Sequence, residues 1–77
     1  MISVDQCRAA RALLNWSAQD LANEAEIGVA TVRRYEAGAP IANPSMTAIE
    51  TALSRAGIAF VSTGEASNQG GEGVRFR

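Results

Sequence analysis

The sequence predicts a small, mainly α-helical domain of four short helices that ends in a β-hairpin. Three observations support this fold class. Of the 77 residues, 47% are hydrophobic, but 15 are Ala, a composition that favours short helices and a thin core. Helix-capping residues, each followed by apolar residues at helical spacing, recur as far as Gly57. Beyond Gly57 the pattern changes to short runs typical of strands.

The first helix is expected to begin after an N-cap at Ser3 and to run to about Leu14. Gln6 stands three residues after Ser3 and completes a capping box, and Ile2 is placed to pack on Cys7 as a hydrophobic staple. The apolar positions that follow have helical spacing: Val4, Cys7, Ala10, Leu13 and Leu14. We interpret Cys7 as a small core residue rather than a reactive thiol.

The second helix repeats the same start. Ser17 is its expected N-cap, Asp20 stands at N3, and Trp16 and Leu21 are placed as a hydrophobic staple. This helix should end near Ala25, which makes it short.

A third helix follows after a turn of about three residues. It is expected to extend from Gly28 to about Ala37, with Val32 and Tyr35 on one side and Gly38 as its C-terminal stop. Two short helices joined by such a turn form a helix-turn-helix, which on geometry alone is a common motif.

The fourth helix should begin with Asn43 as N-cap and Pro44 at N1, after a loop from Ala39. Its apolar positions continue to Gly57, which ends it. Short strands are expected at 58–61 and 74–77, and the Gly- and Ser-rich residues 62–73 are expected to form a flexible loop. We therefore divide the chain into a helical part, 1–57, and a hairpin tail of the same domain, 58–77.

The composition excludes most enzyme chemistry. With no His and one Cys, the chain has no internal disulfide, no His/Cys metal cluster and no Ser-His or Cys-His nucleophile pair. A chain this short cannot easily enclose a substrate pocket either. The longest apolar run, Ile58 to Val61, is far too short to span a membrane, and no signal-peptide pattern opens the chain. We expect a cytoplasmic protein with no enzymatic activity, cofactor, metal site or membrane association.

Net charge does not indicate a nucleic-acid partner, because the formal charge is −1 and the pI is about 5.2. The type of basic residue is more informative. All seven are Arg, the side chain that pairs bidentately with phosphate or guanine, and four of them lie within the first 34 residues.

Residues 17–38 carry the most specific pattern in the chain. They read S-x-x-D-L-A-x-x-A-E-I-G-x-x-T-V-x-x-Y-E-x-G, and Arg8-Ala9-Ala10-Arg11 precedes them. This pattern resembles the lambda-repressor-like (Cro/XRE-type) DNA-binding family over residues 3–57. The resemblance implies that Leu21, Ala22, Ile27, Val32 and Tyr35 form the core that sets the angle between the two helices.

The resemblance also implies an interior ion pair between Arg11 of the first helix and Glu36 at the end of the third. Such a pair would hold the third helix against the first, and a buried charge requires a partner. The alternative is that Arg11 is a solvated side chain on the surface of the first helix.

The third helix would be the recognition helix, with its N-terminal end in the major groove. Its candidate contacts are Gly28, Val29, Ala30, Thr31, Arg33 and Arg34. By the resemblance, Arg34 is the best base reader and Arg33 contacts the DNA backbone or an acidic neighbour. The alternative is that both Arg side chains merely solvate an exposed face.

Phosphate contacts are implied at the start of the second helix, at Ser17, Ala18 and Gln19. The family usually has Gln where this chain has Ala18, so Gln19 or the free N–H groups of the helix start would have to replace it. Glu26 stands where the family usually has Gly, which predicts an unfavourable backbone conformation there. Gly28 replaces the usual Ser or Thr cap.

The leading hypothesis is a sequence-specific, double-stranded DNA-binding transcriptional regulator, a repressor, that acts as a homodimer. The loop 39–44 lacks Lys and Arg, so a monomer should bind weakly, and the strands 58–61 and 74–77 could pair within or between chains. The alternative is a protein-interaction module on the same fold, an antitoxin or antiactivator, which the acidic pI and the uncharged loop favour.

Overall fold

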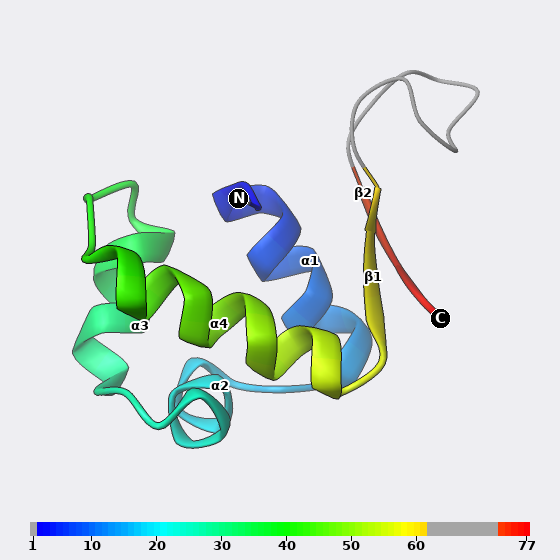
Figure 1. Cartoon of the computed structure of the whole chain (residues 1–77), viewed down its shortest axis with the longest axis horizontal. Coiled ribbons are helices and arrows are strands. Elements are labelled where there is room, and N and C mark those ends of the chain that lie inside the picture. The colour runs from blue at the N-terminus through cyan, green and yellow to red at the C-terminus, as the bar shows by residue number, and fades with distance from the viewer. Residues whose placement is uncertain (1, 62–72) are drawn as a thin grey trace.

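A computed structural model of the chain describes residues 2–61 and 73–77 (Figure 1). Within these ranges the elements are, in order, α1 (Val4–Leu14), α2 (Ala18–Ala25), α3 (Val29–Glu36), α4 (Asn43–Arg55), β1 (Ile58–Val61) and β2 (Gly73–Phe76). The mainly helical fold with a C-terminal hairpin is therefore confirmed. Figure 1 shows the hairpin on the side of the helices that is remote from α3.

Both predicted capping boxes are present. At the start of α1, the Gln6 N–H donates to Ser3 Oγ at 3.1 Å, and the Ser3 N–H donates to Gln6 Oε1 at 2.9 Å. At the start of α2, the Asp20 N–H donates to Ser17 Oγ at 3.0 Å, and the Ser17 N–H donates to an Asp20 carboxylate oxygen at 2.9 Å. Each box satisfies amide groups that a helix start leaves without intrahelical partners.

Two helices end in a left-handed residue that is not glycine. Asn15 and Glu26 both have φ of 58° and close α1 and α2 respectively. Asn tolerates this conformation, whereas Glu pays about 1 to 2 kcal/mol for it. The unfavourable conformation predicted at Glu26 is therefore present. Gly38 (φ 93°) and Gly57 (φ 103°) follow α3 and α4 as the predicted stops.

Three boundary or burial predictions are wrong. The N-cap of α4 is Ala42, with Asn43 already helical, because Pro is accepted anywhere in the first turn, where amide groups lack partners. Strand β2 is Gly73–Phe76 rather than 74–77, since a glycine shows no side-chain alternation. Gly73 thus leaves the predicted flexible loop, whose other residues, 62–72, lie outside the described part of the chain. Leu13 is 42% exposed instead of buried, about 100° around the helix from Leu14.

The core lies where the four helices meet. α1 packs on α3 and α4, and its Cys7 and Ala10 are fully buried. The buried apolar residues are Cys7, Ala10, Leu21, Ala22, Val32, Tyr35, Met46, Ile49, Ala52, Leu53 and Ile58. Four of the five predicted packing residues of the two central helices belong to this set, and Ile27 packs against it. The core thus fixes α2 and α3 relative to each other.

The hairpin forms within the chain. The strands β1 and β2 are antiparallel, with Ile58 opposite Phe76 and Phe60 opposite Val74. The hairpin packs on α1 as well as on α4. The buried side-chain amide of Gln6 joins α1 to both strands. Gln6 Nε2 donates to the carbonyl oxygens of Val61 and Gly73, both at 3.1 Å. The sequence predicted only the capping role of Gln6, because nothing local indicates a bond 55 or 67 residues away.

Candidate nucleic-acid interface

The turn between α2 and α3 is closed by backbone contacts. The Ile27 N–H donates to the Ala22 carbonyl at 3.0 Å, so the chain turns immediately after the left-handed Glu26. On α3, Val32 is fully buried and Tyr35 nearly so. The Tyr35 hydroxyl also donates to the Ile2 carbonyl at 3.0 Å. One side of α3 is therefore committed to the core, and the other side is left to face outward.

A bidentate ion pair fixes the end of α3 against α1. Arg11 Nε donates to Glu36 Oε2 at 2.8 Å and Arg11 Nη2 donates to Glu36 Oε1 at 2.7 Å. The third donor, Arg11 Nη1, reaches the Trp16 carbonyl between α1 and α2 at 2.9 Å. The side chains are 21% and 12% exposed. One guanidinium thus joins α1, the α1–α2 connection and α3, at the two charged residues that the family resemblance pairs.

A thiol completes this cluster. Cys7 Sγ lies 3.4 Å from Glu36 Oε2 and donates to it. Burial, the Glu36 charge and this hydrogen bond raise the pKa of the Cys7 thiol to about 12, so it stays protonated. Burial also disfavours the charged form of Glu36, but hydrogen bonds from Arg11 and Cys7, with the charges of Arg11 and Arg8, outweigh it. The pKa of Glu36 consequently lies below its ordinary value of 4.5.

The outward side of α3 carries small side chains, apart from two Arg residues. Ala30 and Arg34, four positions apart, stand opposite the buried Val32, and Arg33 is exposed beside them. Gly28 is exposed as the N-cap, and it offers no side-chain hydrogen bond to the helix start. Val29 and Thr31 are half-buried, with Val29 packed against the core. Gly28, Val29 and Ala30 therefore lie at the N-terminal end of α3, and Ala30, Arg33 and Arg34 face outward. Val29 and Thr31 flank this outward side and are only partly exposed.

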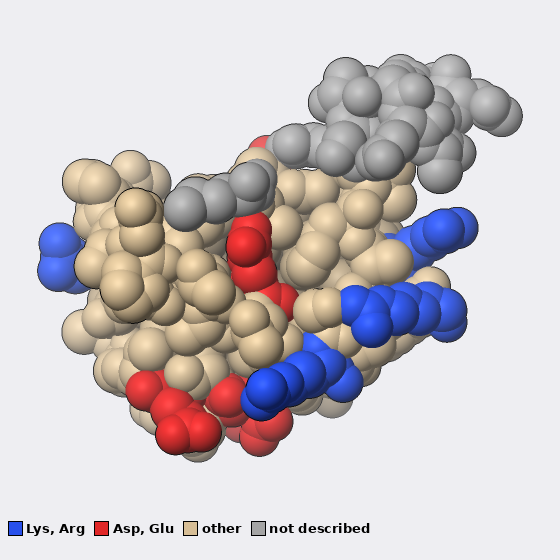
Figure 2. Space-filling model, viewed as in Figure 1, with Lys and Arg blue, Asp and Glu red and all other residues tan. Residues whose placement is uncertain are grey.

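The start of α2 is a separate and differently charged region. Ser17 and Gln19 are exposed, but the Ser17 hydroxyl is used by the capping box and Gln19 Nε2 donates to Asn23 Oδ1 at 2.9 Å. Ala18 is half-buried and packs on the core. The charged residues of this helix, Asp20 and Glu24, are both acidic, and its last turn has no basic residue. Figure 2 shows acidic side chains gathered over α2 along the lower edge of the view.

The cluster around Glu36 includes two groups that the sequence did not indicate, the Trp16 carbonyl and the Cys7 thiol. No local pattern marks a backbone carbonyl as an acceptor for an Arg five residues earlier. Cys7 could have been found, because it lies one turn before Arg11 and faces the same side of α1.

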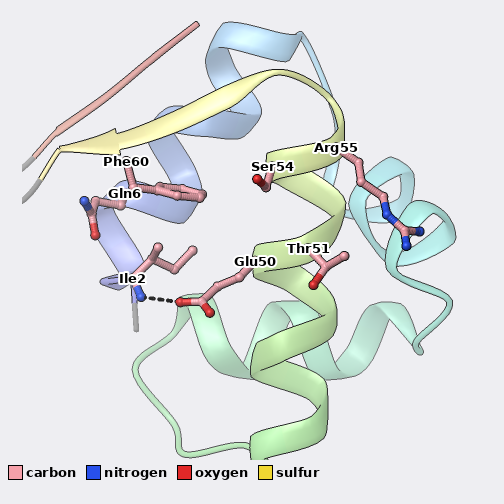
Figure 3. Close-up of a pocket in the computed structure, with 7 residues that line it drawn as sticks. All are labelled: Ile2, Gln6, Glu50, Thr51, Ser54, Arg55 and Phe60. Carbon is pink, nitrogen blue, oxygen red and sulfur yellow. Dashed lines mark hydrogen bonds between the residues drawn. The ribbon is translucent and has the colours of Figure 1, made fainter. Parts of the chain in front are cut away.

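A groove of about 510 Å³ lies on another part of the surface, between α4, β1 and the start of α1 (Figure 3). Phe60 and Ile2 form its apolar wall, and the Ile2 N–H donates to Glu50 Oε1 at 2.7 Å. None of the candidate DNA-contacting residues lines it. Among the described residues, no group of three or more His, Cys, Asp or Glu could hold a metal ion, and no helix is long and apolar enough to cross a membrane.

The residue pattern, the angle-setting core and the outward side of α3 define a helix-turn-helix protein. The family model described as Helix-turn-helix matches residues 8–58, so the chain belongs to this family, in its Cro/C1-type XRE form. The family consists of DNA-binding regulators that are generally not enzymes. A comparison with curated proteins found no match.

Proposed function

We propose that this chain is a sequence-specific, double-stranded DNA-binding transcriptional regulator that reads the major groove with α3. The outward side of α3 carries the proposal. Its two Arg side chains are exposed and lie on a helix whose other side is held by Val32 and Tyr35 in the core and by Glu36 in the ion pair. A helix fixed in this way can present the same donors to every DNA site.

Each candidate on α3 has a chemically distinct role in this proposal. Arg34 donates to guanine O6 and N7, because it is exposed and stands opposite the buried Val32. Arg33, nearer the edge that carries Glu36, contacts phosphate. Ala30 and the half-buried Val29 contact a thymine methyl, and Thr31 a phosphate oxygen. At Gly28 the absence of a side chain lets the backbone approach the duplex.

The start of α2 contributes less. The amide groups of Ala18 and Gln19 lie in its first turn and could bind a phosphate through the helix dipole. The Ser17 hydroxyl oxygen accepts from the Asp20 N–H, so the hydroxyl proton remains to donate to the same phosphate. The Asp20 carboxylate repels phosphate at this position. Binding should therefore depend on α3, weaken steeply with salt and be modest for one subunit.

Two subunits can compensate for weak binding by one. A homodimer places two α3 helices in successive major grooves about 34 Å apart, and thus reads a palindrome. A dimer that occupies a promoter excludes other proteins from it, so we propose that the chain is a repressor acting by occlusion.

Selection from a random duplex pool at two salt concentrations tests this function. The wild-type chain should enrich a palindrome, and the double variant Arg33→Ala with Arg34→Ala should enrich nothing. The matched control is Arg55→Ala with Arg75→Ala, which removes the same charge from two exposed Arg residues of α4 and β2 and should enrich the same palindrome. Absence of enrichment by the wild type would contradict the proposal, as would an unchanged palindrome in the Arg33/Arg34 variant.

A further inference from the structure

Ile2 belongs to no helix or strand, yet both of its backbone polar groups are bound to other elements. Its N–H donates to Glu50 Oε1 of α4 at 2.7 Å, the dashed line in Figure 3. Its carbonyl accepts from the Tyr35 hydroxyl of α3 at 3.0 Å. These two hydrogen bonds, which we call the Glu50–Ile2–Tyr35 bridge, join α4 to α3 through one residue of the segment before α1.

α3 and α4 have little other direct contact. α3 packs on α2 and α1, whereas the backbones of α3 and α4 hardly approach each other. The ion pair does not join them either, because Arg11 connects Glu36 to α1 and to the Trp16 carbonyl. The bridge is therefore a restraint on α3 that the core of the helix-turn-helix and the ion pair do not supply.

Glu50 sets the direction of the Ile2 backbone. The Ile2 side chain packs on the core, but apolar packing is non-directional and leaves the peptide groups free to turn. A hydrogen bond from an amide to a carboxylate is directional and stronger than one between neutral groups. Within the described chain Glu50 forms no ion pair, so the Ile2 amide is the partner that its Oε1 serves. The position of the Ile2 carbonyl thus depends on Glu50.

The other end of the bridge lies beside the two outward Arg residues. Tyr35 follows Arg34 directly, and its ring is 7% exposed, so the hydroxyl ends a side chain that packing already holds. A hydrogen bond at the inner end of this side chain opposes rotation of α3 about its own axis. Such a rotation would turn Arg33 and Arg34 away from a bound duplex, and recognition requires side chains held close to the productive geometry.

We propose that Glu50 is a positioning residue for DNA recognition, which holds Tyr35 through Ile2 and thereby fixes the orientation in which α3 presents Arg34. Glu50 lies on the groove of Figure 3, which none of the candidate contacts lines, so it acts without touching DNA. The effect on DNA binding rests on the proposed function, whereas the effect on α3 does not.

Amide chemical shifts of the isotope-labelled full chain test the bridge without DNA. Glu50→Ala removes the acceptor and should move the signals of Ile2, Arg34 and Tyr35. Glu50→Gln removes the charge but keeps an Oε1 acceptor, so it should return the Arg34 and Tyr35 signals to their wild-type positions. The matched control is Thr51→Ala, at an exposed neighbour that lines the same groove, and it should leave α3 unchanged. Unchanged α3 signals in Glu50→Ala would overturn the proposal.

Affinity for the selected duplex measures the consequence for recognition. Glu50→Ala and Tyr35→Phe should each weaken binding about threefold to tenfold, because each removes one hydrogen bond of the bridge. The double variant should bind no more weakly than the weaker single variant, since both changes break the same connection. Glu50→Gln should stay within about twofold of the wild type, which excludes the lost charge as the cause. Losses that multiply in the double variant, or equal losses in Glu50→Gln and Glu50→Ala, would overturn the proposal.

Circular dichroism establishes that each variant is folded. Should Glu50→Ala unfold, Tyr35→Phe keeps the buried ring and should still move the Ile2 signal and weaken DNA binding; a variant that does neither would overturn the proposal. Bridge-dependent shifts in a chain that selects no DNA sequence would refute the proposed function and leave the bridge standing. A chain that selects a sequence and binds it equally in every variant would do the reverse.

Discussion

The two helices of the helix-turn-helix begin in opposite ways. α2 starts with a complete capping box in which Ser17 and Asp20 satisfy each other's amide groups. α3 starts at Gly28, which has no side chain to cap it, so its first amide groups keep their hydrogen-bonding capacity. The exposed charges differ as well, since α2 presents Asp20 and Glu24 and α3 presents Arg33 and Arg34.

This difference assigns the start of α2 to stability and the start of α3 to DNA recognition. The start of α2 is a self-contained local structure, satisfied within four residues and negatively charged. The start of α3 has no side-chain cap, although Val29 packs on the core, and the rest of the helix is held by Val32, Tyr35 and the Glu36 ion pair. A helix held at its C-terminal end by the protein can offer its N-terminal end to DNA.

Loss of the Glu36 carboxylate should have the largest effect. Glu36→Ala leaves the Arg11 guanidinium largely buried without its bidentate partner, and should lower the free energy of unfolding by about 3 kcal/mol. Urea denaturation measures this loss. A loss below about 0.5 kcal/mol, the size typical of an exposed pair, would show that α3 is not held from this end.

The same residue predicts a pH dependence. Because the pKa of Glu36 is lowered on folding, its charged form stabilises the folded chain above the ordinary value of 4.5, and this contribution is lost as pH falls through the folded-state pKa. The difference in unfolding free energy between wild type and Glu36→Gln should thus be constant near neutral pH and shrink below pH 4.5. A difference that does not change with acid would assign the stabilisation to packing alone.

Single substitutions of the two Arg residues should divide their roles on α3. Arg34→Ala should cost about 1 to 3 kcal/mol of binding to the selected duplex and little of binding to random duplex. Arg33→Ala should weaken both equally and reduce the salt slope by about one. Fluorescence anisotropy with the two duplexes measures these effects. Equal losses of affinity for both duplexes in Arg34→Ala would show that Arg34 does not contact bases.

The smallest effect is expected at α2. Ala18→Gln adds an amide at the position where Gln is usual in the family and should tighten DNA binding only about two- to threefold, because Asp20 still repels phosphate beside it. Anisotropy at fixed salt detects such a change, with unfolding free energy as the control on stability. A gain of a hundredfold would mean that the start of α2, rather than α3, limits binding.

Local sequence rules predicted the fold more completely than the site. The capping boxes at Ser3 and Ser17 and the stops at Gly38 and Gly57 depend on residues within one turn, so the sequence displays them directly. The predicted N-cap of α4 is one residue too late, because Asn43 is a far better N-cap residue than Ala42 and yet lies inside the helix, where Pro44 is tolerated in the first turn.

The sequence predicted only some of the contacts between distant parts of the chain. The family resemblance paired Arg11 with Glu36, but no rule connects Gln6 with carbonyl groups of a hairpin more than fifty residues away. Leu13 shows the same limit, because helical spacing places it near the apolar stripe while the hairpin covers only part of that side. Which of the nine candidate residues touch DNA depends on a partner whose shape the sequence does not contain.

Amide chemical shifts of the isotope-labelled chain, titrated with a short duplex, identify the residues that contact DNA. We expect the largest changes on residues 28–34, at the uncapped start and outward side of α3, with small changes at Ala18 and Gln19 and none along β1. Changes concentrated at the start of α2, or on α4 and the hairpin with α3 unaffected, would contradict it.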